Sequence, residues 1–332
     1  MFSKKQVVAF SLALTVMAGL FAGCGGGDKK APGAAGKKVY NVGIAQLVQH
    51  AALDAANKGL VDGLAAKGFK VGENLKIDQQ NAQADQSNLQ NIANRFVNNK
   101  VDLICAIATP TAQAMANATK DIPIVGTAIT DFKLAKLVKD NNKPGTNVTG
   151  TNDMNPVKEQ VELGLKLAPG TKTLGLLYCS SEVNSQIQAN LAKEAAKAHG
   201  MAVEEATVSN VNDIQQAAQS LISKKVGFIY VPTDNVVASA TAALTKITNE
   251  AKVPVISGEA ALLKNGAAAS MNLDFYKLGK MAGEMAGDIL LGKSKPADMP
   301  VKGQDKFEPV ISKAAVQTLG LKVPADLEKY VK

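Results

Sequence analysis

The chain has 332 residues, of which 46% are hydrophobic and 4% aromatic, and its formal net charge is +8. This length is sufficient for two domains of ordinary size. The lysine residues are scattered and form no basic cluster interleaved with aromatic residues, so we expect a solvated basic surface and no nucleic-acid binding.

The N-terminus has the order of features found in a secretory signal peptide. Lys4 and Lys5 give a cationic start, and residues 7–23 form an apolar run that ends in small residues. We therefore predict a signal peptide over residues 1–23. An uncleaved membrane anchor is the alternative, but the apolar run is short for a spanning helix and no basic cluster follows it directly.

The next residue, Cys24, completes a sequence typical of bacterial lipoproteins. Leu20-Phe21-Ala22-Gly23-Cys24 resembles a lipobox, in which the cysteine is acylated and becomes the mature N-terminus, and Phe21 stands where leucine is usual. The alternative for Cys24 is a free structural cysteine. Residues 24–38, rich in Gly, Ala and Lys, predict a flexible tether. Because two or more acyl chains hold a protein stably at a membrane, we expect an extracytoplasmic protein, lipid-anchored to the bacterial cell membrane on its periplasmic side or at the outer cell surface.

From residue 39 onward, short apolar strands alternate with amphipathic helices. In the first half we predict strands over 39–47, 75–80, 101–108 and 122–128, and helices over 51–67, 87–99 and 111–119. In the second half we predict strands over 173–178, 202–208, 226–231 and 253–257, and helices over 185–199, 213–224 and 236–251. Strands separated by helices of this length indicate a parallel sheet with helices on both faces. The predicted fold class is therefore α/β, with two doubly wound parallel-sheet lobes.

Three segments are expected to cross between the lobes, over residues 143–155, 267–274 and 300–311. Helices over 276–291 and 313–319 follow the second and third crossings. We predict an N-terminal lobe of residues 39–148 plus 273–302 and a C-terminal lobe of residues 149–272 plus 303–332. The three crossings would then form the hinge.

Polar residues follow several of the predicted strands, and ligands of open parallel sheets bind at that edge. Thr109 is a candidate N-cap with Pro110 at the first helical position, and a helix start with hydroxyl groups suits a carboxylate. An ionised Asp234 suits an ammonium group. Groups of both signs favour a zwitterionic ligand. Each residue also has a structural interpretation: helix capping for Asp234, Asn235 and Ser185, a turn for Asp131, and a loop histidine without a ligand for His50.

These residues belong to motifs that resemble the tryptophan/tyrosine-type ABC transporter substrate-binding proteins. The motifs are Val42–Gln46 with His50–Ala56, Ile107–Gln113, Glu182–Ser185 and Pro232–Asn235, in a resemblance that runs from about Val39 to Pro324. It implies a type I periplasmic-binding-protein fold, delivery of the ligand to an ABC permease with its ATPase, and an aromatic amino acid (tryptophan, tyrosine or phenylalanine) or a similar small zwitterion as the ligand. We expect the protein to be a monomer. Carried over position by position, the resemblance places the ligand site at Gln46, His50, Thr109, Thr111, Asp131, Glu182, Asn184, Ser185, Asp234, Asn235 and Asp274.

The sequence also departs from this family's pattern at three places. Phe132 stands where proline is usual, Cys179-Ser180-Ser181 replaces Asn-Pro-Gly, and Ser312 stands where asparagine is common. The first two changes flank the predicted site, so another amino acid or small solute stays an alternative ligand. A sensory receptor subunit is a further alternative, because docking on a signalling protein and on a permease both exploit closure. The aromatic residues that can stack on a ligand or pack in a core are Tyr178, Tyr230, Phe132, Phe275 and Tyr276.

The sequence carries no pattern that favours catalysis. His50 and His199 are the two histidines, no G-x-S-x-G elbow is present, and neither a P-loop nor a G-x-G-x-x-G fingerprint follows a strand. An exported hydrolase is therefore an unsupported alternative. No CxxC or clustered Cys/His spacing is present, so we predict no metal and no cofactor. An exported compartment permits a disulfide between Cys105 and Cys179, but both lie in or beside apolar strand segments of different lobes, so we expect two buried thiols.

Overall fold

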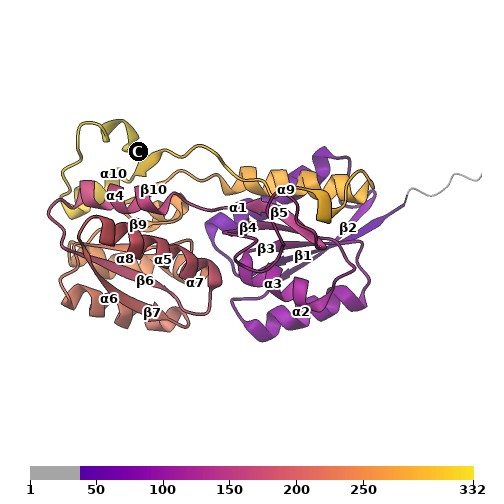
Figure 1. Cartoon of the computed structure of the whole chain (residues 1–332), viewed down its shortest axis with the longest axis horizontal. Helices are drawn as coiled ribbons and strands as arrows, with labels where there is room; N and C mark the ends of the chain where they lie inside the picture. Colours follow the sequence, from indigo (N-terminus) through magenta and orange to yellow (C-terminus); the bar gives the residue numbers. More distant parts are fainter. Residues whose placement is uncertain (1–37) are drawn as a thin grey trace, which may run out of the picture. The chain divides into compact units, whose positions relative to one another are not determined.

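The computed structural model describes residues 38–332. The predictions on the signal peptide, on Cys24 and on the tether up to residue 37 lie outside the described residues. The described chain forms two α/β lobes, each built on one sheet with helices on both faces (Figure 1). Within residues 38–332, no helix has the length and apolar character needed to cross a membrane.

The N-terminal lobe is a parallel five-stranded sheet with the strand order β2-β1-β3-β4-β5. Helices α1 and α9 lie on one face of this sheet, and α2 and α3 lie on the other (Figure 1). Every residue of β3 and β4 is buried, as expected for central strands covered on both faces. The elements are β1 (Tyr40–Gln46), α1 (Ala51–Ala66), β2 (Leu75–Asn81), α2 (Gln86–Asn98), β3 (Leu103–Ile107), α3 (Thr109–Ala118), β4 (Ile124–Ile129), β5 (Val148–Asn152), α9 (Phe275–Leu290) and the short 3₁₀ helix η3 (Pro296–Asp298).

The C-terminal lobe is a six-stranded sheet with the order β11-β10-β9-β8-β6-β7, parallel except for β11, which pairs antiparallel with β10. Alternate residues of β6 face opposite sides: Leu176 packs in one apolar cluster with α4 and α5, and Leu177 packs in another with α6, α7 and α8. The elements are α4 (Val157–Leu167), β6 (Thr173–Cys179), α5 (Val183–Ala198), β7 (Ala202–Val208), η1 (Val211–Asp213), α6 (Ile214–Ser223), β8 (Phe228–Val231), α7 (Asn235–Ser239), α8 (Thr241–Glu250), β9 (Val255–Ser257), η2 (Ala260–Asn265), β10 (Ala269–Met271), β11 (Pro309–Ile311), α10 (Lys313–Leu319) and η4 (Glu328–Tyr330).

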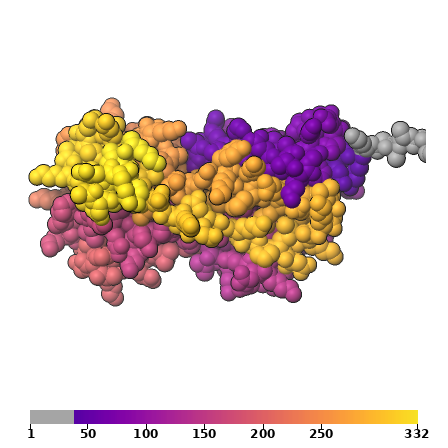
Figure 2. Space-filling model, turned by 90° about the horizontal axis from the view of Figure 1, so that it is seen from above, coloured from indigo at the N-terminus to yellow at the C-terminus, as the bar shows by residue number. Residues whose placement is uncertain are grey.

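Helix α9 returns the chain to the N-terminal lobe, where it packs closely against α1. A Cβ atom on Gly59 would lie 2.0 Å from the Tyr276 carbonyl oxygen, and one on Gly283 would lie 2.1 Å from the Leu60 carbonyl oxygen. The absence of side chains at these glycines lets the two backbones approach each other. Figure 2 shows the orange surface of α9 directly beside the indigo surface of the first helix. This packing fixes α9 to the first lobe although it follows the second lobe in sequence.

The predicted α/β architecture is confirmed, with differences at particular elements. Strand β5 lies inside the segment 143–155, which the sequence suggested as a crossing. The sequence did not predict this strand because its residues VTGTN lack an apolar alternation. The predicted lobe boundary after residue 148 therefore falls at the start of β5, whose residues pair with β4 in the first sheet. Helix α4 was not predicted. The expected helix over 236–251 is two helices, since Ala240 has a non-helical φ of −123° between them.

The other two predicted crossings each contain a short strand. Residues 267–274 include β10 and residues 300–311 include β11, and these three-residue strands pair with each other in the second sheet. Strands of this length carry no recognisable period in the sequence. The chain still passes between the sheets three times: from β5 to α4, from β10 to α9, and from α9 to β11.

Candidate functional site

Most of the predicted site residues lie at the carboxyl ends of parallel strands, as the fold class leads one to expect. In the N-terminal lobe they follow β1 and β3, and in the C-terminal lobe they follow β6 and β8. Nine of the predicted residues are buried: Gln46, His50, Thr109, Thr111, Glu182, Asn184, Ser185, Asp234 and Asn235.

The imidazole ring of His50 joins the two lobes. His50 precedes α1, and its Nε2 atom lies 3.3 Å from Oδ1 of Asn235, at the start of α7. Its Nδ1 atom lies 3.7 Å from Oε2 of Glu259, which follows β9. A further contact between the lobes runs from Gln188 Nε2 to Thr130 Oγ1 at 3.2 Å. The strand ends of the two sheets therefore face each other across buried polar contacts.

The hydrogen bonds around Asn235 fix the protonation of the His50 ring. The Asn235 side-chain amide donates to Glu182, so its oxygen is the atom that faces His50. Nε2 of His50 must then carry the hydrogen, and Nδ1 of the neutral ring presents a lone pair. Burial lowers the pKa of His50 and outweighs the opposite effects of Asn235 and Asp54, which favours this neutral form.

Asp234 has the contacts of a structural cap. One carboxylate oxygen accepts a hydrogen bond from Val237 N at 2.8 Å in the first turn of α7. The other accepts from Cys179 N at 2.6 Å and from Ser185 Oγ at 2.7 Å. Burial raises the pKa of Asp234, and these donors oppose the shift. The carboxylate thus binds the starts of α5 and α7 together, which is the capping role that the sequence left open for Asp234.

Glu182 is likewise supplied with donors from its own lobe. Its Oε2 atom accepts from Asn184 Nδ2 at 2.8 Å and from the Asn235 amide, and its Oε1 atom accepts from Val236 N at 3.2 Å. Burial and the neighbouring Asp234 raise the pKa of Glu182. The arrangement orients Asn184 and Asn235 through one carboxylate.

A second group of buried polar atoms has no hydrogen-bond partner within residues 38–332. Most buried polar groups in proteins are paired, so unpaired atoms at the strand ends of both lobes suit a polar ligand. The atoms of this group that belong to strand ends and to the β5 crossing are His50 Nδ1, Thr109 Oγ1, Thr111 Oγ1, Asp153 Oδ1, Asn184 Oδ1 and both carboxylate oxygens of Glu259.

Asp153 and Glu259 were missing from the predicted site. Burial raises the pKa of Asp153 to about 7. Burial also raises the pKa of Glu259 well above its ordinary value, and the nearby Asp153, Asp234 and Glu182 add to the shift. Glu259 follows the strand predicted over 253–257, so its position alone was a signal for it. Asp153 follows β5, and without that strand its place at a sheet edge was not visible in the sequence.

The start of α3 differs in detail from the prediction. The helix begins at Thr109, and the N-cap position is taken by Ala108, which has φ +89°. Thr109 is therefore the first helical residue and not the cap. The helix starts two residues before the predicted range of residues 111–119. The hydroxyls of Thr109 and Thr111 are both buried in this first turn. The helix start still offers free backbone N–H groups beside two hydroxyls.

Three predicted residues have contacts that serve the local structure. Asp131, half-buried, accepts a hydrogen bond from Leu134 N at 2.9 Å in a turn. Asp274, which is exposed, caps α9 by accepting from Lys277 N at 3.0 Å. Gln46 is held between Asp54 and Asn57 of α1. The structure does not bring Asp274 to the buried group, because it lies at the exposed crossing into α9.

Residues 41–332 match the model of the family described as ABC transporter substrate binding protein. The chain belongs to this family. It is 42% identical over 341 residues to the tyrosine-binding protein of Clostridioides difficile (strain R20291), a match that covers 100% of this chain and 97% of the relative. ABC transporter substrate-binding proteins act outside the cytoplasm, so this chain is an extracytoplasmic protein.

Two solved structures are similar over the same lobes. The ABC domain in complex with L-Trp from Streptococcus pneumonia is 40% identical with a TM-score of 0.85, covering 89% of this chain and 100% of that one. The ligand-free, open structure of a substrate-binding protein with adhesive properties from Clostridium difficile is 44% identical with a TM-score of 0.66, covering 89% and 98%. The type I periplasmic-binding-protein fold that the sequence resemblance implied is confirmed.

The aromatic residues of this substrate-binding protein are mostly part of its cores. Phe132 is fully buried beside Gly126 in the N-terminal lobe, and Phe275 belongs to the same apolar cluster. Tyr230 is buried and donates its hydroxyl hydrogen to Gln160 at 2.8 Å. Tyr178 contacts Glu205 on the neighbouring strand. These contacts favour the core-packing interpretation over ligand stacking for all four.

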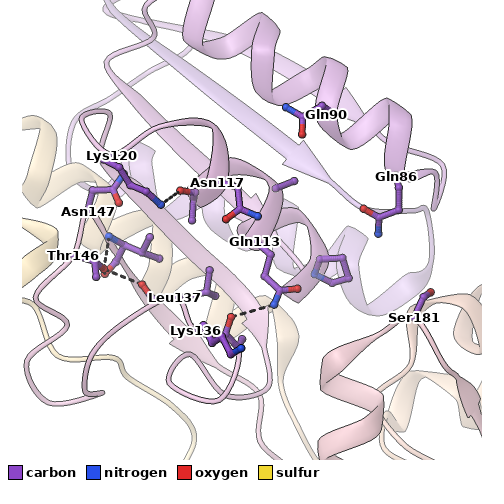
Figure 3. A pocket seen from close by; sticks show the side chains of 15 residues that line it. Gln86, Gln90, Gln113, Asn117, Lys120, Lys136, Leu137, Thr146, Asn147 and Ser181 are labelled. Atoms are coloured by element: carbon purple, nitrogen blue, oxygen red, sulfur yellow. Dashed lines mark hydrogen bonds between the residues drawn. The ribbon is translucent and has the colours of Figure 1, made fainter.

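A separate groove of about 560 Å³ lies between α2, α3 and the loop before β5 of the N-terminal lobe, and it reaches Ser181 of the C-terminal lobe (Figure 3). Amide side chains line it, including Gln113, whose Nε2 atom donates to Ala135 O at 3.1 Å. None of the predicted site residues lines this groove. Within residues 38–332 no group of three or more His, Cys, Asp or Glu side chains is placed to hold a metal ion, and Cys105 and Cys179 are buried free thiols.

Proposed function

We propose that this solute-binding protein captures an aromatic L-amino acid between its two lobes. The observation that carries the proposal is the group of buried, unpaired polar atoms contributed by both lobes, with hydroxyls on α3 and acceptors around Glu259. The names of similar proteins support it, since one is a tyrosine-binding protein and another was solved with L-Trp.

The degree of similarity to the two solved structures supports a closed arrangement. The TM-score is higher for the L-Trp complex (0.85) than for the ligand-free, open structure (0.66), although sequence identity is lower for the complex (40% against 44%). Sequence divergence therefore does not account for the lower score. The direct contact between His50 and Asn235 also fits lobes that have closed on each other.

The first turn of α3 supplies the proposed carboxylate site. Thr109 and Thr111 present hydroxyls that have no partner within the described chain, next to backbone N–H groups that a helix leaves free at its start. The positive end of the helix dipole favours an anion there. A ligand carboxylate at this position would give acceptors to the donors of this first turn.

The proposed partners follow from family membership and from the N-terminus. An extracytoplasmic protein that is acylated at Cys24 would stay at the membrane and pass its ligand to an ABC permease with its ATPase. A sensory receptor subunit would use the same closure, and the genes adjacent to this one separate the two roles. Catalysis is not proposed: His50 is engaged between the lobes, and His199 lies at the surface, 3.3 Å from Glu162.

The ligand is tested by a thermal-shift screen of the twenty amino acids on verified ligand-free protein, followed by calorimetry. We expect tyrosine, tryptophan or phenylalanine to raise the melting temperature, because a ligand that binds only the native state stabilises it by mass action. Thr111→Val should then weaken binding by about tenfold, through one lost hydrogen bond and an unpaired carboxylate oxygen. Thr207→Val, at an exposed position of β7, is the matched control. No stabilisation by any aromatic amino acid would refute this ligand class.

A further inference from the structure

Glu259 differs from the other buried carboxylates of the C-terminal lobe. Its side chain is 1% exposed, and neither of its oxygens accepts a hydrogen bond from any residue in the range 38–332. Asp234 and Glu182, by contrast, each accept at least three hydrogen bonds from their own lobe. A buried carboxylate without donors is costly unless a cation or donor is brought to it.

The nearest atom of the other lobe cannot act as that donor. Nδ1 of His50 lies 3.7 Å from Glu259 Oε2, and the tautomer set by Asn235 leaves a lone pair on this nitrogen. When Glu259 is ionised, the state that a bound cation favours, two acceptors therefore face each other across the boundary between the lobes. Their separation is short enough for a single nitrogen donor to contact both.

A third acceptor belongs to the same hydrogen-bonded cluster. Asn184 Nδ2 donates to Glu182 Oε2 at 2.8 Å and to Thr233 O at 2.9 Å, so its orientation is fixed. Its Oδ1 atom is buried and has no partner in the described part of the chain. A primary ammonium group has three N–H donors, one more than the pair of Glu259 and His50 requires, so an unpaired amide oxygen of the same cluster suits it chemically.

The charged groups that act on Glu259 and His50 are acidic. Asp153 from the β5 crossing, Glu182 from the start of α5 and Asp234 from the start of α7 all act on Glu259. Asp54 of α1 acts on His50. His50 itself is neutral by burial and brings no compensating charge. A cation is the ligand group that this surrounding favours.

We infer that Glu259 and His50, one from each lobe, form the site for the ligand's α-ammonium group, with Asn184 Oδ1 as a further acceptor. The inference rests on the proposed function and deepens it, because it makes a free primary ammonium a requirement for tight closure. It assigns to Glu259 the role that the sequence suggested for Asp234. N-acylated and deaminated analogues leave the buried carboxylate unpaired and should be rejected strongly.

Calorimetry with L-tyrosine and its deaminated analogue 3-(4-hydroxyphenyl)propionate tests the assignment. Glu259→Gln should weaken L-tyrosine binding by about 30-fold or more, because a buried charge pair is lost. The same substitution should strengthen binding of the deaminated analogue, by about threefold or more, because it removes the buried carboxylate that this ligand leaves unpaired. Glu204→Gln, on the outer strand β7, is the control for removing an acidic side chain.

Several results would overturn the inference. L-Tyrosine binding that survives in Glu259→Gln, or equal losses for both ligands, would show that Glu259 does not contact the ammonium. If Glu259→Gln does not fold, Glu259→Asp takes its place, because it keeps the charge. Its affinity for each ligand is compared with that of the wild type, and the loss should be smaller for L-tyrosine than for an N-acetylated tyrosine.

The two proposals fail in distinguishable ways. A non-aromatic amino acid that stabilises the wild-type protein but not Glu259→Gln would refute the aromatic ligand and support the ammonium site. A wild-type protein stabilised by none of the twenty amino acids nor by tyramine would overturn both.

Discussion

His50 and Asn235 come from different lobes and share one buried hydrogen bond, 3.3 Å from Nε2 to Oδ1. Asn235 is held in the orientation that this bond needs because its amide group donates to Glu182. The contact is therefore prepared within the C-terminal lobe and completed by a residue of the N-terminal lobe. Closure is coupled in this way to the arrangement of the polar side chains that face the ligand site.

Replacing His50 should weaken ligand binding without much effect on folding of the separate lobes. His50→Ala removes the contact with Asn235 and one acceptor near Glu259, and we expect an affinity loss of about tenfold, the cost of one buried hydrogen bond. Calorimetry with L-tyrosine measures the loss, and small-angle scattering should show a smaller ligand-induced compaction. His199→Ala is the control, because His199 lies at the surface beside Glu162. Equal affinity in both variants would contradict a role for His50 in closure.

Replacing Asp234 should mainly lower stability. Asp234→Ala removes the cap of α7 and leaves the donors of Cys179 and Ser185 unpaired, and we expect the free energy of unfolding to fall by about 2–3 kcal/mol. Urea denaturation of ligand-free protein measures this quantity. Asp274→Ala removes a cap at an exposed helix start with one such bond and should cost about 1 kcal/mol or less. Similar losses in the two variants would show that the extra contacts of Asp234 contribute little.

The sequence predicted the architecture because its central strands are continuous apolar runs and its main helices show a clear helical period. The buried run Leu103–Ile107 is an example, and it marks the edge where Thr109 and Thr111 stand. Weak elements were missed for the opposite reason. Strand β5 is polar, and β10 and β11 are too short to show a period.

The same limits apply to the candidate site. Position after a strand identified most of the buried polar residues, but it does not tell which of them are already satisfied by the protein. Asp234 and Glu259 both follow strands, and only the hydrogen bonds made by Cys179, Ser185 and Val237 separate the cap from the unpaired carboxylate. Such bonds depend on residues distant in sequence, so spacing alone could not assign them.

The stability of ligand-free protein should depend on pH through Asp153. Burial raises its pKa in the folded chain from 3.8 to about 7, so the native state holds a proton that the unfolded state has lost between these values. The contribution is complete below the unfolded pKa and is lost as pH rises through the folded one. We expect the free energy of unfolding to decrease between about pH 4 and pH 7, by an amount on the order of a few kcal/mol.

Urea denaturation at several pH values checks this dependence. Asp153→Asn removes one titrating group and should reduce the slope of the curve, while Asp234, Glu182 and Glu259, whose pKa values burial also raises, keep their contributions. Asp131→Asn serves as the control, because Asp131 is half-buried in a turn. A curve that keeps its slope in Asp153→Asn would assign the effect to other buried carboxyls such as Glu182, whose pKa is also raised by burial.

The close packing of α1 against α9 predicts a strong effect of a single methyl group. A Cβ at Gly59 would lie 2.0 Å from the Tyr276 carbonyl oxygen, and backbone on both sides leaves no flexible side chain to move away. Gly59→Ala should therefore lower the free energy of unfolding by about 1–3 kcal/mol, although alanine has the higher helix propensity. Ala65→Val, at an exposed position of the same helix, adds comparable bulk without this contact and should cost less than about 1 kcal/mol. If Gly59→Ala were neutral or stabilising in urea denaturation, α9 would have to lie farther from α1 in solution. The packing that fixes α9 to the first lobe would then be less close than the structure shows.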